Sequence, residues 1–325
     1  TEGRLWVGTY EGLFRVSTEP GGTGERSILE PVDIELPSKA VMTIREAAAG
    51  VLQLGCWDGG VVTYDLASGR SETQALPDNR IYTMTETRDG ILWVGTWGSG
   101  LYAIEPGGEV THFSGDPESG HLANPIVYAL YQDASDILWI GTNGAGVQKI
   151  SPRKRDFRRF GHDRNSPRTL PLGKVNVITR DQEGALWFGI YNGGLNRYLE
   201  SEDRIVTYRH REDDPSSLPN DIVNVIYQDE AGEFLVGTHG GIARLIKEEE
   251  RFELWGRDFN EEVPLPDEIV YAIEEDAGGR LWIGTYNAGI VRYDPETGTL
   301  EEYGHDPEDP RSLSDNLVYN ILEDS

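Results

Sequence analysis

Residues 92–96 read LWVGT, and six further copies of this pentapeptide, one identical and five variant, are spread through the chain. The glycine that marks each copy lies 40 to 48 residues from the next. A regular period of this length indicates a repeat protein, in which each unit packs on its neighbours. The seven marking glycines are Gly8, Gly55, Gly95, Gly141, Gly189, Gly237 and Gly284.

All the units have the same internal order. An apolar segment such as LPNDIVNVI (218–226) comes first, and an Asp/Gly turn joins it to the pentapeptide. A Gly-rich turn then leads to a third segment such as LNRY (195–198), and a less regular fourth follows, such as RIVTYRH (204–210). Short β-branched and aromatic segments bounded by Gly, Pro, Asn and Asp are typical of strands. Four strands per repeat predict an all-β, seven-bladed β-propeller of four-stranded antiparallel blades, forming one domain over residues 1–325.

The two ends of the chain hold complementary parts of one unit. The pentapeptide at 5–9 has no first strand before it, whereas residues 317–323 read as a first strand with nothing after them. We expect these segments to pair within one blade, which would leave no open sheet edge there. The copy LQLGC (52–56) departs most from the pattern, so its blade is expected to be the least regular. Because the chain begins inside a strand pattern, we also expect it to be a segment of a longer protein.

Charge and composition exclude several classes of partner. The chain of 325 residues has 56 acidic and 29 basic side chains, a formal net charge of −27. Such a surface repels phosphate backbones, so nucleic acid is not an expected partner. No apolar run approaches the roughly 20 residues that span a bilayer, so we expect no direct membrane insertion. Cys56 is the only cysteine, which excludes an internal disulfide and a thiolate metal cage.

The repeated LW-[VIF]-GT strings, the Gly-rich turns after them and the loop HDPEDPRSLSDN (305–316) resemble the two-component regulator propeller repeat. The resemblance extends over all seven units. In that family, such blades form the periplasmic sensor of membrane-spanning histidine kinases, hybrid kinases and some diguanylate cyclases. The resemblance therefore implies a periplasmic ligand sensor within a larger membrane-anchored bacterial receptor, and it allows homodimerisation through neighbouring domains.

The residue directly after each Gly-Thr pair is the main candidate for ligand binding. Five of these seven residues are Tyr or Trp, in a chain that is 10% aromatic. Their turns should share a propeller face with the loops that enter the innermost strands, so we expect a ring of side chains there. Aromatic faces stack on sugar rings, which predicts an oligosaccharide or related small ligand, although each ring could instead only cap its own blade. The seven residues are Tyr10, Trp57, Trp97, Asn143, Tyr191, His239 and Tyr286.

Three basic residues are predicted on the same face. Lys39, Arg80 and Lys174 lie in loops that precede the first strands, and basic residues are scarce in so acidic a chain. Together they could accept a carboxylate or sulfate group of a ligand. The alternative is that they are ordinary solvated surface charges.

The sequence shows no catalytic or metal constellation. His162, His210 and His305 hold equivalent positions in different repeats, so they cannot converge on one ion. The repeated tryptophans are expected to pack between blades. The turn aspartates are expected in solvated positions on the opposite face, namely Asp133, Asp181, Asp229, Asp276 and Asp324.

These observations favour a non-catalytic sensor without catalytic residues, metal or cofactor. Two alternatives stay open. One is a propeller polysaccharide lyase or hydrolase, for which His239 with Tyr191 or Tyr286 is the candidate set. The other is a protein-interaction or dimerisation scaffold, which an acidic surface and flat propeller faces would allow.

Overall fold

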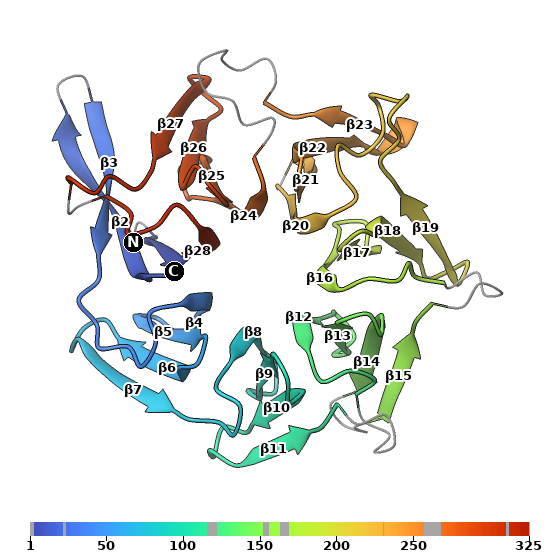
Figure 1. The fold of residues 1–325 in the computed structure, drawn as a ribbon, viewed down its shortest axis with the longest axis horizontal. Helices are drawn as coiled ribbons and strands as arrows, with labels where there is room; N and C mark the ends of the chain where they lie inside the picture. Colours follow the sequence, from blue (N-terminus) through green and yellow to red (C-terminus); the bar gives the residue numbers. More distant parts are fainter. Residues whose placement is uncertain are drawn as a thin grey trace. The chain divides into compact units, whose positions relative to one another are not determined.

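The computed structural model describes residues 3–21, 24–115, 122–151, 156–162, 169–229, 231–256, 268–309 and 312–324. These residues form seven antiparallel sheets of four strands each, which confirms the predicted all-β, seven-bladed β-propeller (Figure 1). The chain divides into two compact units, Thr1–Asn79 with Gly256–Ser325 and Arg80–Trp255, and each is described by itself. The expectation of one domain over residues 1–325 stays a prediction.

The first unit contains three of the described sheets. The seam blade has the order β28 (Val318–Glu323), β1 (Leu5–Thr9), β2 (Gly12–Gly21) and β3 (Gly24–Pro31). The second consists of β4 (Val41–Ala48), β5 (Val51–Cys56), β6 (Gly60–Asp65) and β7 (Arg70–Gln74). The third consists of β24 (Val270–Glu275), β25 (Leu281–Thr285), β26 (Ile290–Asp294) and β27 (Thr299–Tyr303).

The second unit contains the other four sheets. The first of these consists of β8 (Ile81–Glu86), β9 (Leu92–Thr96), β10 (Leu101–Ile104) and β11 (Val110–Phe113). The second consists of β12 (Val127–Gln132), β13 (Leu138–Thr142), β14 (Val147–Ser151) and β15 (Asp156–Phe160). Next come β16 (Val175–Arg180), β17 (Leu186–Ile190), β18 (Gly194–Leu199) and β19 (Arg204–Tyr208). The last sheet is β20 (Val223–Gln228), β21 (Phe234–Thr238), β22 (Gly241–Ile246) and β23 (Arg251–Leu254), with a 3₁₀ turn η2 (Lys247–Glu249) before β23.

The seam blade forms as predicted from the two ends of the chain. Strand β1 pairs antiparallel with β28, from Leu5 opposite Glu323 to Thr9 opposite Val318. Asp324 stabilises this pairing of β1 with β28, because its Oδ1 accepts a hydrogen bond from the Arg4 backbone N–H at 2.6 Å. The blade β4–β7, which contains the degenerate pentapeptide, has two register shifts between its first two strands, whereas the other first-strand pairings have one.

The pentapeptide forms the second strand of each blade and is buried over most of its length. Within each unit, its glycine lies where the first strand of the next blade comes closest. A Cβ on Gly141 would stand 2.9 Å from a Val175 methyl group, and one on Gly189 would stand 2.6 Å from Val223. Any side chain there would push neighbouring blades apart, so glycine is required by this close approach.

The turn aspartates are not solvated, which corrects the expectation from the sequence. Asp133, Asp181, Asp276 and Asp324 are buried, although Asp229 is half-buried. Each of the four buried carboxylates accepts a hydrogen bond from the indole Nε1 of the buried tryptophan in its blade, at 2.8 to 3.1 Å. Buried polar groups have to be paired, and here one carboxylate pairs both the indole and the turn backbone. The aspartates are therefore part of the blade core.

Candidate functional site

The residues after Gly-Thr lie beside the loops that enter the innermost strands. Their backbone N–H groups donate to the carbonyl of the residue just before the first strand. Tyr191 donates to Lys174 at 2.8 Å, and His239 donates to Ile222 at 3.1 Å. Equivalent bonds join Trp57 to Ala40, Trp97 to Arg80, Asn143 to Ile126 and Tyr286 to Ile269.

A second set of residues, which sequence reasoning missed, lies next to them. Each first strand has a register shift opposite the Gly-Thr pair, so one residue is left without a cross-strand partner. Such β-bulges re-aim a side chain and are common next to binding sites. The signal in the sequence was the tyrosine that follows the first apolar residue of the strand in four of seven repeats. The bulge residues are Met42, Tyr82, Tyr128, Asn176, Asn224, Tyr271 and Tyr319.

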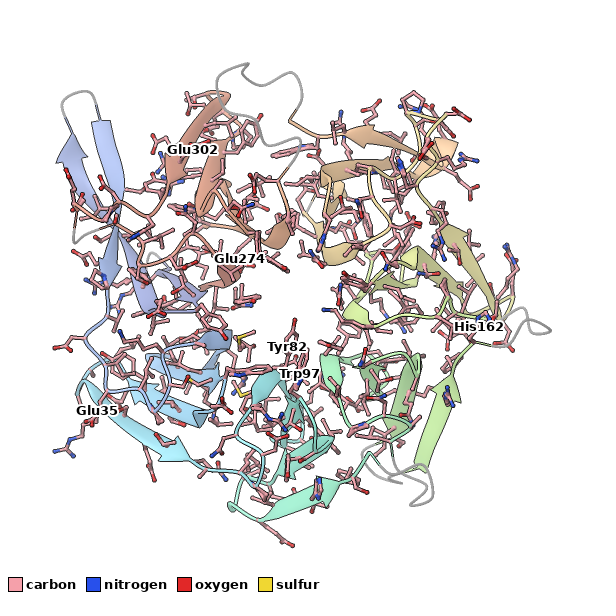
Figure 2. The ribbon with its side chains drawn as sticks, in the orientation of Figure 1. Glu35, Tyr82, Trp97, His162, Glu274 and Glu302 are labelled. Atoms are coloured by element: carbon pink, nitrogen blue, oxygen red, sulfur yellow. The ribbon has the colours of Figure 1, made fainter. Side chains whose placement is uncertain are left out.

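In the unit Arg80–Trp255, both sets meet in one continuous group, which we call the aromatic arc. The ring centroid of Trp97 lies 5.9 Å from that of Tyr82, and both residues are labelled in Figure 2. The Trp97 centroid also lies 5.3 Å from that of Tyr128. Tyr128 and Tyr191 both lie under the Lys174 ammonium, whose Nζ is 4.5 and 5.2 Å from their centroids. Tyr191 meets His239 edge-to-face at 6.0 Å. The arc consists of Tyr82, Trp97, Tyr128, Lys174, Tyr191 and His239.

Burial changes the protonation of the ionisable groups in the arc. It lowers the pKa of Lys174, and it raises the pKa of Tyr128 to about 12. The pKa of His239 is lowered, first by burial and then by the charge on Lys174. Both shifts favour the neutral forms of the Tyr128 phenol and the His239 imidazole at neutral pH.

The other unit has a smaller cluster, the tyrosine row. Tyr319 on β28 lies 6.4 Å from Tyr10 and 5.3 Å from Tyr271, measured between ring centroids, and Tyr271 lies 6.3 Å from Tyr286. Tyr10 and Tyr286 are each 45% exposed, so their ring faces are open to a ligand. The row contains no lysine.

The structure brings together only part of the predicted site. Trp97, Lys174, Tyr191 and His239 join the arc, and Tyr10 and Tyr286 join the row. Asn143 is linked to Lys174 by an isolated β-bridge. Trp57 and Arg80 are half-buried, and the exposed Lys39 lies 3.8 Å from the carboxylate of Glu11.

The three equivalent histidines have a structural role. In His162, His210 and His305, the Nδ1 atom is hydrogen-bonded to the carbonyl of the leucine eight residues later. Within the described ranges, no three His, Cys, Asp or Glu side chains come together in a way that could hold a metal ion. Across those same residues, no helix has the length and apolar character needed to cross a bilayer.

Residues 75–98, 121–144 and 264–287 match the family model for the two component regulator propeller. These repeats belong to the two-component regulator propeller family. Each matched segment ends two residues after a Gly-Thr pair, so the matches include Trp97, Asn143 and Tyr286. No curated protein sequence matches the chain.

Solved structures share the fold of this regulator propeller at low sequence identity. The extracellular domain of BT3049 from B. thetaiotaomicron, described as a putative hybrid two component system, has a TM-score of 0.72 and 20% identity, over 87% of this chain and 37% of that one. PorZ, a surface component of the type-IX secretion system of Porphyromonas gingivalis, has a TM-score of 0.66 and 17% identity, over 95% and 47%. A catalytically inactive virginiamycin B lyase from Staphylococcus aureus with quinupristin has a TM-score of 0.62 and 17% identity, over 89% and 88%. The regulator propeller thus spans less than half the length of the first two.

Proposed function

We propose that this propeller is a non-catalytic, extracytoplasmic ligand-sensing domain of a bacterial signalling receptor. We further propose that it binds an oligosaccharide or a related small ligand at the aromatic positions after Gly-Thr. The two-component regulator propeller repeats support the signalling context. The observation that carries ligand binding is the aromatic arc, in which rings from all four blades of one unit form a chain of contacts.

The chemistry of the arc suits a sugar ring better than a purely apolar ligand. Indole and phenol faces stack on the apolar side of a pyranose, while hydroxyl groups and the ammonium orient its polar edge. Tyr191 is 37% exposed, so a ligand can reach this part of the arc without any unfolding of the blade. Exposed aromatic groups of this kind commonly mark binding surfaces.

Removing the two tryptophans of the ligand-binding set tests the proposal. We expect Trp57→Ala combined with Trp97→Ala to weaken binding of whichever oligosaccharide binds the wild type by about ten-fold or more, because stacking area is lost. The measurement is isothermal titration calorimetry against a glycan panel. Val110→Ala, an exposed change on the outermost strand β11, is the control and should leave affinity unchanged. A folded double variant that binds as tightly as the wild type would remove these tryptophans from the site.

A second candidate function, a polysaccharide lyase, is favoured by the contact of His239 with Tyr191 beside Lys174. In β-elimination from a uronic acid unit, an ammonium would offset the carboxylate charge and a neutral base would take the adjacent carbon-bound proton. The C–O bond to the leaving sugar would then break as the C=C bond forms, and the Tyr191 phenol would donate a proton to the departing oxygen. Burial and Lys174 lower the pKa of His239, so its imidazole is available as that base at neutral pH.

The lyase candidate predicts that His239→Ala abolishes release of unsaturated oligosaccharides from polygalacturonate. The ultraviolet absorbance of the product double bond provides the measurement. His112→Ala is the matched control, because His112 lies on β11, stacks on Tyr102 and is not a member of the arc. If the wild type binds the polymer and releases no product, the lyase function is excluded and the sensor proposal is unaffected.

A further inference from the structure

Lys174 is a half-buried lysine within the aromatic arc. Its ammonium lies over the rings of Tyr128 and Tyr191, and burial is the cause that lowers its pKa. Among the residues that the structure describes, no carboxylate lies within ion-pair distance of its Nζ, and no acceptor is hydrogen-bonded to that atom. This is notable in a chain where acidic side chains outnumber basic ones by 56 to 29.

An ammonium can donate three hydrogen bonds, and two aromatic faces satisfy none of them in full. The opposite case is Lys247 in the same unit, whose Nζ lies 3.2 Å from Asp181 and 3.4 Å from Glu183. Lys247 therefore completes a structural cluster, whereas the charge of Lys174 is left available. After burial, the charge of Lys174 is the second cause that lowers the pKa of His239.

We propose that Lys174, between the rings of Tyr128 and Tyr191, is the subsite for an anionic group, a carboxylate or a sulfate, carried by a sugar that binds on the aromatic arc. This inference rests on the proposed function for the sugar and names its charge class. A half-buried ammonium pairs with an anion more strongly than a solvated one does, because fewer water molecules screen the pair. The overall negative charge of the protein repels anions elsewhere, so the subsite also supplies selectivity.

Lys149 provides a matched control within the same unit. Its Nζ lies 5.0 Å from the ring centroid of Trp139 and 5.2 Å from that of Phe160, so it is also a lysine over two aromatic rings. It is on β14, outside the arc. Replacing either lysine by methionine keeps most of the side-chain length and removes the charge.

Two measurements test the subsite separately from oligosaccharide sensing. The first is calorimetry of wild type, Lys174→Met and Lys149→Met with trigalacturonate and with neutral galactotriose. We expect Lys174→Met to weaken trigalacturonate binding about ten-fold or more, and Lys149→Met to change it less than about two-fold. The second is acetylation of Lys174, read by mass spectrometry, in the presence of inorganic sulfate or monomeric galacturonate. We expect either anion to protect Lys174 and to leave Lys149 as reactive as before.

The outcomes separate the two proposals. If neither anion protects Lys174, or if Lys174→Met binds trigalacturonate as tightly as the wild type, the anion subsite is overturned. If the wild type binds galactotriose as tightly as trigalacturonate, and Lys174→Met changes neither affinity, the anion subsite is overturned and the proposal of oligosaccharide sensing stands. If an anion protects Lys174 from acetylation but the protein binds no oligosaccharide, the anion subsite is supported and oligosaccharide sensing is overturned.

Discussion

Replacing Glu274 by Gln is expected to stabilise the protein at pH 8 by on the order of 1–3 kcal/mol. Glu274 lies on β24, where burial is the main cause that raises its pKa, to about 7 (Figure 2). The negative charges of Glu323 and Glu275 raise the pKa further, and the hydrogen bond from the Glu323 backbone N–H opposes the shift. The ionised carboxylate is thus disfavoured in the folded state, and an amide of similar size removes that cost.

The sign of the pH dependence follows from the same shift. Between the ordinary pKa of a glutamate and about 7, the folded state holds a proton that the unfolded state has released. Stability therefore falls as pH rises through this interval, and the cost of the charge is complete above it. Below about pH 4 both states are protonated, so the wild type and Glu274→Gln should differ little there.

Urea unfolding of both proteins at pH 4 and pH 8 measures this difference in the free energy of unfolding. Glu302→Gln is the control, since Glu302 is exposed on β27 and its replacement should change stability by less than about 0.5 kcal/mol at either pH. An equal difference between Glu274→Gln and the wild type at both pH values would show that charge burial is not the cause.

The fold could be predicted because its causes repeat. Within each unit, the glycine of the pentapeptide is required by the close approach of the next blade, as at Gly141 and Gly189, so the same packing requirement recurs at a regular spacing in the sequence. The pairing of β1 with β28 could be predicted as well, because two incomplete units were complementary. The blade is thus a local structure that the local sequence specifies.

The candidate site was only partly predictable from the sequence. It combines the residue after Gly-Thr with the bulge residue of the first strand, and only the three-dimensional structure shows the second of these positions. The residues after Gly-Thr follow a motif and stand out. The bulge tyrosines, such as Tyr128, lie inside an ordinary strand pattern, and the pattern does not show that the register shifts there. The bulge is what brings Tyr128 to Lys174, which comes from a different blade.

The aspartates were misinterpreted for a related reason. An Asp before Gly in a turn is usually a solvated turn former, and its sequence does not show what lies beneath it. The informative signal was the spacing of six residues between Asp and Trp that recurs in three repeats, as in Asp181 and Trp187. That spacing places the carboxylate over the indole N–H once the turn closes.

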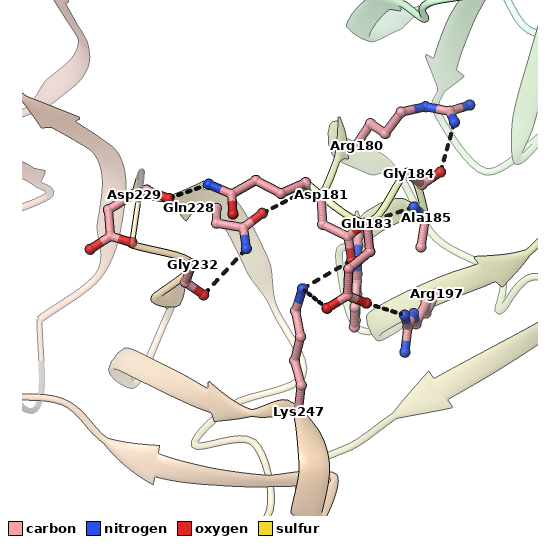
Figure 3. Close-up of polar contacts among 12 residues, drawn as sticks. Arg180, Asp181, Glu183, Gly184, Ala185, Arg197, Gln228, Asp229, Gly232 and Lys247 are labelled. Carbon is pink, nitrogen blue, oxygen red and sulfur yellow. Dashed lines mark hydrogen bonds and ion pairs between the residues drawn. The ribbon is translucent and has the colours of Figure 1, made fainter.

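Loss of this carboxylate should have the largest effect on stability, and Asp181→Ala is expected to cost on the order of 3–5 kcal/mol. Asp181 Oδ1 accepts the Ala185 backbone N–H at 2.8 Å (Figure 3). Its Oδ2 accepts the Trp187 indole N–H at 2.8 Å and pairs with Lys247 at 3.2 Å. Burial alone would raise the pKa of Asp181, but these bonds and the Lys247 charge outweigh it and lower the pKa. Removing the side chain leaves a buried indole N–H without an acceptor.

Asp229 in the next blade is the matched control. It holds the same turn position and accepts the Glu233 backbone N–H at 2.6 Å, but Leu235 replaces the tryptophan beneath it. Asp229→Ala should therefore cost only about 1 kcal/mol, the contribution of one turn hydrogen bond. Urea unfolding at pH 7 compares the two variants. Trp187→Phe provides a further test, because this variant has no indole N–H at that position. In the Trp187→Phe background, Asp181→Ala should therefore lower the free energy of unfolding by less than it does in the wild type. Equal costs for Asp181→Ala and Asp229→Ala would mean that the turn, and not the bond to tryptophan, is what the carboxylate stabilises.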